Sequence, residues 1–299
     1  MRLVLRKRQL IRIIGCVVLC FAAQGFNSAL GQTKLAKSDV SRAHTTRKVA
    51  TLDRATAENH PLWPALKLAV ESYQHIRKDV RDYSCKVVRR ERIRGVLQPR
   101  EFMTAKVRHQ RKRNGKVAVP FGVYLKVLAP TKVKGREVLF VNGQNDGKMF
   151  VRNGGKRFAF VTTTISPESD TAMASNRYPI TDFGFENLVK RLIVVVKEDM
   201  LISSDTDVQF FEDAKIDGRS CTAVKVTHPT YDERLRFHTA TVFVDNELRV
   251  PIHYEAYDWP EEKGAEPVLL EQYTYRDIKL NVGFTDYDFD PANSSYKVQ

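Results

Sequence analysis

The chain has 299 residues, of which 49 are lysine or arginine and 35 are aspartate or glutamate, so its formal net charge at pH 7 is +14. Hydrophobic residues make up 42 % of the chain, yet beyond a short N-terminal run no segment is apolar enough to cross a bilayer. This excludes a multi-spanning helical membrane protein, and the excess of basic residues points to anionic partners.

The N-terminal segment predicts export. Its basic residues are followed by an apolar run from Ile13 to Ala23 and then by the small-residue pattern Ala29-Leu30-Gly31. A basic start, a short apolar stretch and a small-residue site are typical of a secretory signal peptide. We therefore predict a signal peptide over residues 1–31, cleaved near Gly31-Gln32, and a protein of the periplasm or cell envelope. An uncleaved anchor is the alternative, although the apolar run is shorter than the ~20 residues of a spanning helix.

Cleavage would leave two cysteines, Cys85 and Cys221, and a formal charge of +9. Two cysteines in an oxidising compartment can pair, and a bridge that closes so long a loop contributes about 4–5 kcal/mol in the chain-entropy model. We predict a Cys85–Cys221 disulfide, with two separately buried thiols as the alternative.

Residues 32–59 are polar and poor in large apolar side chains, which predicts a flexible leader. The remaining residues, 60–299, contain no Pro- or Ser-rich linker and no internal repeat, so we expect a single domain. Two stretches in it have helical periodicity, one over 62–80 and one over 185–196 with Thr181 or Asp182 placed to cap it.

Most of the domain consists of strand-like runs broken by turn residues. Alternating or apolar runs occupy 83–87, 103–107, 121–128, 136–141, 148–152, 156–165, 207–213, 219–227, 236–245, 249–258 and 268–280. The connections between neighbouring runs are short, whereas parallel strands need crossovers of about a dozen residues or more. The predicted fold is therefore mainly β (α+β), a wide curved antiparallel half-barrel of about nine to eleven strands with two or three helices on its concave face.

Several segments carry a family resemblance. VFVDNELRVPIHYEAYDWP and EQYTYRDIKLNVGFTDYDFDP resemble the last three strands of the periplasmic lipoprotein-carrier superfamily, which includes Lol-type carriers and mycobacterial lipid-binding lipoproteins. DYSCKVVRRERIRG, PFGVYLKVLAP, KGREVLFVNGQNDGK and NRYPITDFGFENLVKRL resemble an exported bacterial family catalogued as a domain of unknown function, over about residues 62–293. The resemblance implies an open half-barrel with helices in its mouth and an apolar cavity between them.

Eight apolar side chains are candidates to line such a cavity: Val123, Leu125, Val127, Leu188, Leu192, Val196, Ile252 and Tyr254. A cavity lined by these side chains would suit acyl chains, because lipid sites are apolar clefts with few polar groups. The same pattern also fits an ordinary filled core.

The segment from Lys86 to Lys116 has twelve basic and two acidic residues. If the charges gather on one face of the sheet, they would attract anionic membrane surfaces or acidic polysaccharide, with Arg89, Arg90, Arg92, Arg94 and Arg108 as candidates. The alternative is a solvated outer face that protects a sheet edge. We expect no nucleic-acid partner for an exported protein.

No arrangement of residues predicts a metal, a cofactor or catalysis. The histidines form no zinc-binding pattern, and His238 and His253 fall out of register on neighbouring strands. Asp286, Asp288 and Asp290 alternate, but Pro291 and Lys297 occupy positions where a calcium loop needs Gly and Glu, so a polar exposed tail is expected. No nucleophile elbow, S-x-x-K motif or phosphate-binding glycine loop is present.

The leading hypothesis is therefore a non-enzymatic protein that binds or carries a lipid, a lipoprotein or another apolar ligand. A protein-binding or sensory module that uses the curved sheet as a docking face is the alternative, and a hydrolase with a site assembled from distant loops is a third. The ligand and the oligomeric state stay open.

Overall fold

A computed structural model describes residues 53–156, 159–262 and 264–298, which belong to one compact unit. The predicted signal peptide and the leader up to residue 52 lie outside the described residues. The last residues of the predicted leader form a short helix, α1 (Arg54–Glu58), which begins where Asp53 accepts a hydrogen bond from the Thr56 amide.

Two long helices match the predicted periodic stretches. They are α2 (Trp63–Asp79) and α4 (Phe185–Asp199), which pack against each other. The connections contain a short helix, α3 (Asp170–Met173), and the 3-10 turns η1 (Asn145–Gly147) and η2 (Ile180–Asp182). A further 3-10 turn, η3 (Asp286–Phe289), follows the last strand. In the described part of the chain, no helix has both the length and the hydropathy to cross a bilayer.

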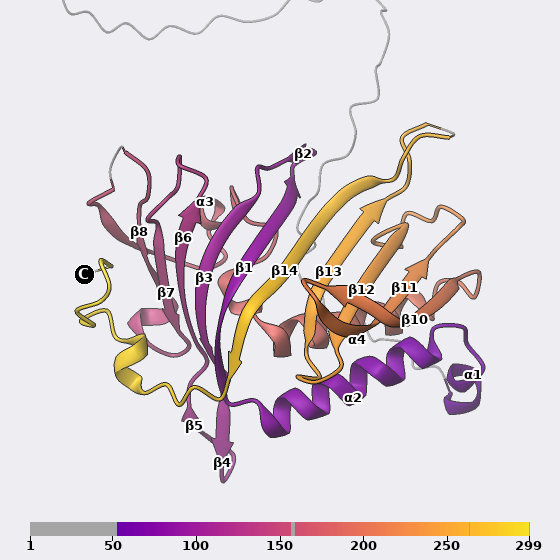
Figure 1. Ribbon diagram of the computed structural model, residues 1–299, viewed down its shortest axis with the longest axis horizontal. Helices are drawn as coiled ribbons and strands as arrows, with labels where there is room; N and C mark the ends of the chain where they lie inside the picture. Colours follow the sequence, from indigo (N-terminus) through magenta and orange to yellow (C-terminus); the bar gives the residue numbers. More distant parts are fainter. Residues whose placement is uncertain (1–52, 157–158, 263, 299) are drawn as a thin grey trace, which may run out of the picture. The chain divides into compact units, whose positions relative to one another are not determined.

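The strands form one large antiparallel sheet and one small hairpin (Figure 1). The strands are β1 (Asp82–Ile93), β2 (Val96–Leu97), β3 (Glu101–Arg108), β4 (Arg111–Arg113), β5 (Lys116–Val119), β6 (Gly122–Ala129), β7 (Glu137–Val141), β8 (Met149–Arg152), β9 (Thr162–Ile165), β10 (Asp207–Ile216), β11 (Arg219–Thr227), β12 (Thr239–Asp245), β13 (Pro251–Asp258) and β14 (Val268–Leu280).

The large sheet has 12 strands in the order β10-β11-β12-β13-β14-β1-β3-β6-β7-β8-β9, with β2 paired to β1 beside this path, while β4 and β5 form the hairpin. The predicted curved antiparallel architecture is confirmed. Strand β1 is the middle strand of the path and pairs on one side with β3 and on the other with β14, which comes from the far end of the chain.

The inward face of the sheet carries the main hydrophobic core. Alternate residues of β1, β3, β6, β13 and β14 meet the apolar faces of α2 and α4, because side chains on a strand point alternately to the two faces. The fully buried members include Tyr83, Val107 and Val123 of the sheet and Ile76 and Phe185 of the helices. The helices therefore cover the concave face as predicted, and α4 lies behind the sheet in the view of Figure 1.

Helix α4 begins differently from the prediction. Neither Thr181 nor Asp182 caps it; Asp182 ends the 3-10 turn η2, and Gly184 is the N-cap, with φ +102°. The hydroxyl of Tyr83 instead accepts a hydrogen bond of 3.1 Å from the Phe185 amide, and its ring stacks on the Phe185 ring. A side chain at position 184 would run into that hydroxyl, so glycine suits both the close approach and the backbone angle.

The outer face of β6 and β7 is covered by the C-terminal segment, residues 283–298. Tyr296 stacks on Tyr124 with ring centroids 3.8 Å apart, and Phe289 and Val298 complete this second core. The prediction of an exposed tail holds for Asp286 and Asp290, which are exposed, but is wrong for the segment as a whole, whose apolar side chains are packed on the sheet. Asp286 and Asp288 form ion pairs with Arg108 and Lys106 across this face. The sequence pattern missed this because the apolar anchors are separated by polar turn residues.

The predicted disulfide is also wrong. Cys85 and Cys221 are separate buried thiols, on β1 and β11. Three strands lie between β1 and β11 in the sheet, which places the two roughly 19 Å apart at about 4.8 Å per strand. A disulfide needs Cα atoms within about 7 Å. Burial raises the pKa of the Cys85 thiol above its usual value, which makes it unreactive.

The Tyr83 hydroxyl gives a first prediction. Tyr83→Phe should lower the free energy of unfolding by about 1–2 kcal/mol, because the buried Phe185 amide loses its acceptor while the ring packing remains. Urea denaturation measures the change. Tyr231→Phe, at a side chain that is 67 % exposed, is the matched control and should leave stability unchanged. Equal effects of both changes would show that the hydroxyl does not anchor α4.

Asp245 gives a prediction for pH dependence. This carboxylate is buried at the turn between β12 and β13, where it pairs with Arg219 and accepts hydrogen bonds from the Glu247 and Leu248 amides. Burial opposes its ionisation, but these bonds outweigh burial and lower the pKa of Asp245 below its usual value. Its contribution is therefore complete above the unfolded pKa of about 3.9 and is lost as the pH falls through the folded pKa.

We expect Asp245→Asn to cost about 1–3 kcal/mol at pH 7, and to cost progressively less as the pH is lowered from 5 towards 2. Denaturant unfolding of both proteins across this pH range measures the difference. A difference that stays constant with pH would contradict the role given to the ionised carboxylate.

Candidate functional site

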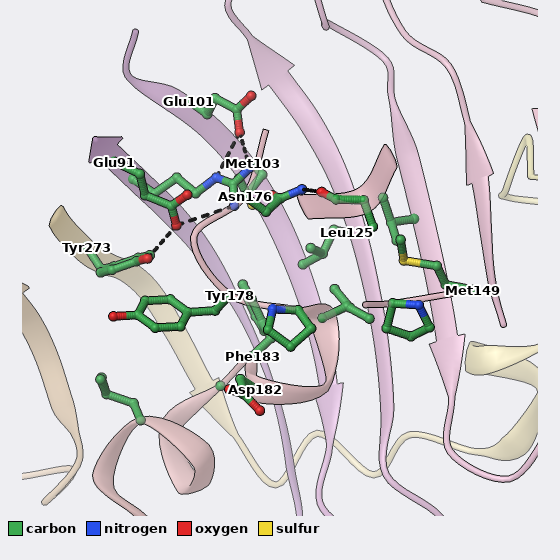
Figure 2. A pocket seen from close by; sticks show the side chains of 18 of the residues that line it. Glu91, Glu101, Met103, Leu125, Met149, Asn176, Tyr178, Asp182, Phe183 and Tyr273 are labelled. Atoms are coloured by element: carbon green, nitrogen blue, oxygen red, sulfur yellow. Dashed lines mark hydrogen bonds and ion pairs between the residues drawn. The ribbon is translucent and has the colours of Figure 1, made fainter. Parts of the chain in front are cut away.

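The inward face of the sheet is not filled everywhere. A pocket of about 110 Å³ lies between the β1–β3–β6–β7 part of the sheet, the start of α4 and the segment that joins β9 to α4 (Figure 2). We call this segment, residues 166–184, the covering segment. It contains α3 and η2 and forms one whole wall of the pocket, with Pro167, Ala172, Asn176, Tyr178 and Ile180 among its lining residues.

The sheet side of the pocket is apolar. Its side chains come from four neighbouring strands and from α4: Met103, Leu125, Val127, Val138, Met149 and Leu188. Strand alternation brings the sheet residues of this set to one face, since inward positions on a strand are two residues apart. Leu188 reaches the same space from α4. This part of the pocket can hold an apolar group and offers it no hydrogen bond.

One end of the pocket is strongly polar. Arg89 of β1 donates two hydrogen bonds, of 2.8 and 2.6 Å, to Glu101 of β3, and lies 3.7 Å from Glu91. Tyr273 of β14 donates a short hydrogen bond to Glu91, and Figure 2 shows Glu91, Glu101 and Tyr273 above the ring of Tyr178. Burial by itself would lower the pKa of Arg89, but the carboxylates of Glu91 and Glu101 raise it above its usual value.

A second buried carboxylate stands directly opposite the first. Glu271 of β14 is the register partner of Glu91, and both are at most 5 % exposed. Like charges in directly opposed positions are destabilising, so each needs its own partners. Glu271 accepts hydrogen bonds from Tyr178 (2.9 Å) and Tyr254 (3.3 Å) and lies 3.6 Å from Arg177.

Two further arginines line the pocket without a carboxylate partner among the described residues. Arg191 of α4 lies flat over Tyr178, with its Cζ atom 3.5 Å from the ring centroid, and its Nη1 atom is buried without an acceptor. Arg136, just before β7, has a buried Nε atom without an acceptor. Burial lowers the pKa of Arg136, because the opposing effect of Glu101 is the smaller one and Arg89 adds to the lowering.

Three of the eight predicted cavity residues, Leu125, Val127 and Leu188, line this pocket. The other five pack elsewhere in the main core: Val123, Ile252 and Tyr254 are buried in it, and Leu192 and Val196 of α4 are half-buried against it. Residues of α4 and β13 therefore share one hydrophobic core, and the hollow lies to one side of it, under the covering segment.

The five predicted surface arginines do not form one patch. Arg89, which is half-buried, and Arg108, which is buried, form ion pairs with Glu101 and Asp286 on opposite faces of the sheet. Arg90 and Arg92 bond to backbone oxygens, those of Gln98 and of Leu269 and Gly95, while Arg94 is exposed in a turn. The basic segment divides between the faces because strand alternation separates neighbouring residues.

No group of three or more His, Cys, Asp or Glu suited to a metal ion occurs in the described ranges. His238 and His253 are out of register, since His253 pairs with Phe243. His228 is fully buried between Asp199, at 3.2 Å, and Thr206, at 3.2 Å. An acid, a histidine and a hydroxyl in this order resemble a hydrolytic triad, but none of the three residues lines the pocket. They join the end of α4 to the residues next to β10 and β11.

Sequence reasoning missed the polar end of the pocket. Arg89 and Glu91 alternate on one strand, which placed them on one face, but nothing in the sequence paired Glu91 with Glu271. Arg136, Tyr178 and Arg191 lie in a turn, a connection and a helix, and only the fold brings them together. The one available sign was a run of arginines and glutamates within a strand that otherwise has apolar inward positions.

The fold is an open, curved antiparallel sheet with helices on its concave face. The candidate site is a pocket between the sheet and the covering segment, with an apolar side and one polar end. The chain belongs to the family described as "Protein of unknown function (DUF1571)", whose sequence model matches residues 80–298. This confirms the narrower of the two predicted resemblances. No curated protein matches the chain.

Solved structures similar to this chain have low identity. A putative outer membrane lipoprotein-sorting protein domain from Vibrio parahaemolyticus is 13 % identical, with a TM-score of 0.35, over 78 % of this chain and 97 % of that one. LprF from Mycobacterium bovis is 12 % identical, with a TM-score of 0.38, over 76 % and 97 %. MucB of the Pseudomonas aeruginosa MucA/MucB complex is 14 % identical, with a TM-score of 0.41, over 76 % and 60 %. At these TM-scores the likenesses do not define what this chain binds.

The position of Arg89 gives a prediction that separates the buried network from a surface patch. Arg89→Met should lower the free energy of unfolding by about 3–5 kcal/mol, because it leaves Glu101 and Glu91 without their neutralising charge. Arg94→Met, at an exposed position of the same basic segment, is the control and should change stability by less than about 0.5 kcal/mol. Thermal or urea unfolding measures both, and similar small effects would contradict the network.

Proposed function

We propose that this protein is exported and that it binds a lipid, the acyl part of a lipoprotein or another apolar ligand in the pocket under the covering segment, without catalysis. The observation that carries the proposal is the apolar wall of the pocket, built from four strands and α4 on the concave face of the sheet. Export is supported by the N-terminal sequence pattern of basic, apolar and small residues.

The size of the pocket sets how a ligand would enter. Its volume of about 110 Å³ is well below the ~300–1,000 Å³ of sites that enclose a drug-sized ligand. A long chain therefore needs more room than the closed pocket offers. The covering segment is the wall that can move, because it is a connection without a strand of its own, whereas the opposite wall is the hydrogen-bonded sheet.

Filling the pocket tests the proposal. Val127→Phe would place a ring in the apolar part of the pocket, and it should weaken binding of a fluorescent fatty acid by about tenfold or more. Leu128→Phe is the matched control, since Leu128 is the next residue of the same strand and its side chain is exposed on the other face. Fluorescence titration measures both variants, and circular dichroism checks that both fold.

The natively secreted protein provides a second measurement for the same proposal. Organic extraction followed by mass spectrometry should release lipid from the wild type. No lipid in the extract together with no uptake of fatty acid would contradict the proposal. That outcome would favour the alternative of a protein-docking sheet, whose edge strand β10 presents exposed Phe210 and Phe211.

A further inference from the structure

Two arginines that line the pocket each have a buried guanidinium nitrogen without an acceptor. The two atoms are Nε of Arg136 and Nη1 of Arg191. A charged donor that is buried without an acceptor loses its hydration and gains nothing in return. Such a position is stable only if other interactions hold it, or if an acceptor enters the site.

The carboxylates in and around the pocket are already paired with other arginines. Glu101 accepts both hydrogen bonds of Arg89, Glu91 lies beside the same arginine, and Glu271 is 3.6 Å from Arg177. The remaining carboxylate of the pocket lining, that of Asp182, is exposed. Among the described residues, no ion pair joins Arg136 or Arg191 to a carboxylate. Glu271, whose Oε2 atom is buried without a hydrogen-bond donor, acts on Arg191 only at longer range, where against the effect of burial it favours the charged guanidinium and raises its pKa.

The surroundings hold both arginines in place without satisfying them. The ring of Tyr178 supports Arg191 from below by a cation–π contact, which fixes the plane of the guanidinium but leaves its edge free to donate. Arg136 precedes β7, whose pairing with β6 and β8 fixes the backbone beside the pocket. Preorganised guanidinium edges of this kind match carboxylate and phosphate groups, which accept two parallel hydrogen bonds.

The apolar wall begins beside these arginines. Leu188 lies on the same helix as Arg191, three residues earlier, and Val138 follows Arg136 by two residues. A ligand that satisfies both parts of the pocket therefore has an acidic group joined to an apolar chain.

We propose that the ligand of this pocket is an anionic amphiphile, whose carboxylate or phosphate head group is bound by Arg136 and Arg191 while its chain lies against the apolar wall. The inference rests on the proposed function and names the charge of the ligand. It assigns Arg136 and Arg191 as residues that determine specificity.

The test compares three amphiphiles with the same twelve-carbon chain: dodecanoic acid, dodecyl phosphate and dodecanol. Each is titrated into the purified protein, with inorganic phosphate and acetate as head groups without a chain. We expect the two acids to bind about tenfold to a hundredfold more tightly than the alcohol, the size expected for charge-assisted hydrogen bonds. Isothermal titration or displacement of a fluorescent apolar probe measures the affinities.

Substitutions test the assignment of the two arginines. Arg136→Met and Arg191→Met should each reduce the preference for acid over alcohol, and the double variant should abolish it while dodecanol binding stays within about threefold of wild type. Arg94→Met is the matched control, because Arg94 is exposed outside the pocket lining, and it should keep the full preference. If the double variant does not fold, Arg136→Lys replaces it, because lysine keeps the positive charge. The Arg136→Lys protein should retain part of the preference for acid over alcohol.

The outcomes separate the two proposals. Equal binding of all three amphiphiles by the wild type would contradict the proposal that the ligand has an anionic head group, while the proposed apolar binding site would remain supported. Failure of all three to bind would overturn the proposed function itself. Phosphate or acetate binding as tightly as the chain-bearing acids would overturn the amphiphile, because the chain would then contribute nothing. A preference unchanged in both methionine variants would overturn the role of these arginines.

Discussion

The pairing of β1 with β14 is the interaction on which the rest of the structure depends. It joins the two halves of the chain at the middle of the sheet, where Glu91 pairs with Glu271 and accepts a hydrogen bond from Tyr273, 182 positions away in the sequence. Its register places the inward side chains of both strands beneath α4 and the covering segment. A shift of one residue would turn every one of these side chains to the opposite face.

The same register also brings two buried negative charges together at the polar end of the pocket. It sets the carboxylates of Glu91 and Glu271 opposite each other in a buried place, where two isolated negative charges would be strongly unfavourable. Tyrosine hydroxyls from β13, β14 and the covering segment and arginines from β1 and the covering segment surround them. A network of this kind stabilises the fold less than an apolar core of equal size would, so its presence beside a hollow favours a functional origin.

Local sequence patterns predicted the fold well. Alternating apolar and polar residues indicate the strands, and turn residues between them indicate the short connections of an antiparallel sheet. The β12, β13 and β14 strands lie within a few residues of their predicted bounds, and α4 was found from its periodicity. The site was predicted only in part. Leu125, Val127 and Leu188 were predicted because they are apolar residues at inward positions of regular elements. Arg136 and Arg191 were not, because only long-range packing brings these charged residues to the pocket. The disulfide failed for the same reason: strand order, which no local pattern contains, separates Cys85 from Cys221.

The C-terminal segment has a consequence for how the chain folds. It covers the outer face of β6 and β7, where Tyr124, Leu139 and Val141 would otherwise form an apolar strip on a bare sheet. The Lys297 amide also donates to Glu137, a carboxylate with no exposed surface. Both this cover and β14, the neighbour of the middle strand β1, follow every other strand in the sequence. The earlier part of the chain therefore cannot complete the sheet or cover its outer face during synthesis. We expect the nascent chain to remain incompletely packed until residues 268–298 have been synthesised.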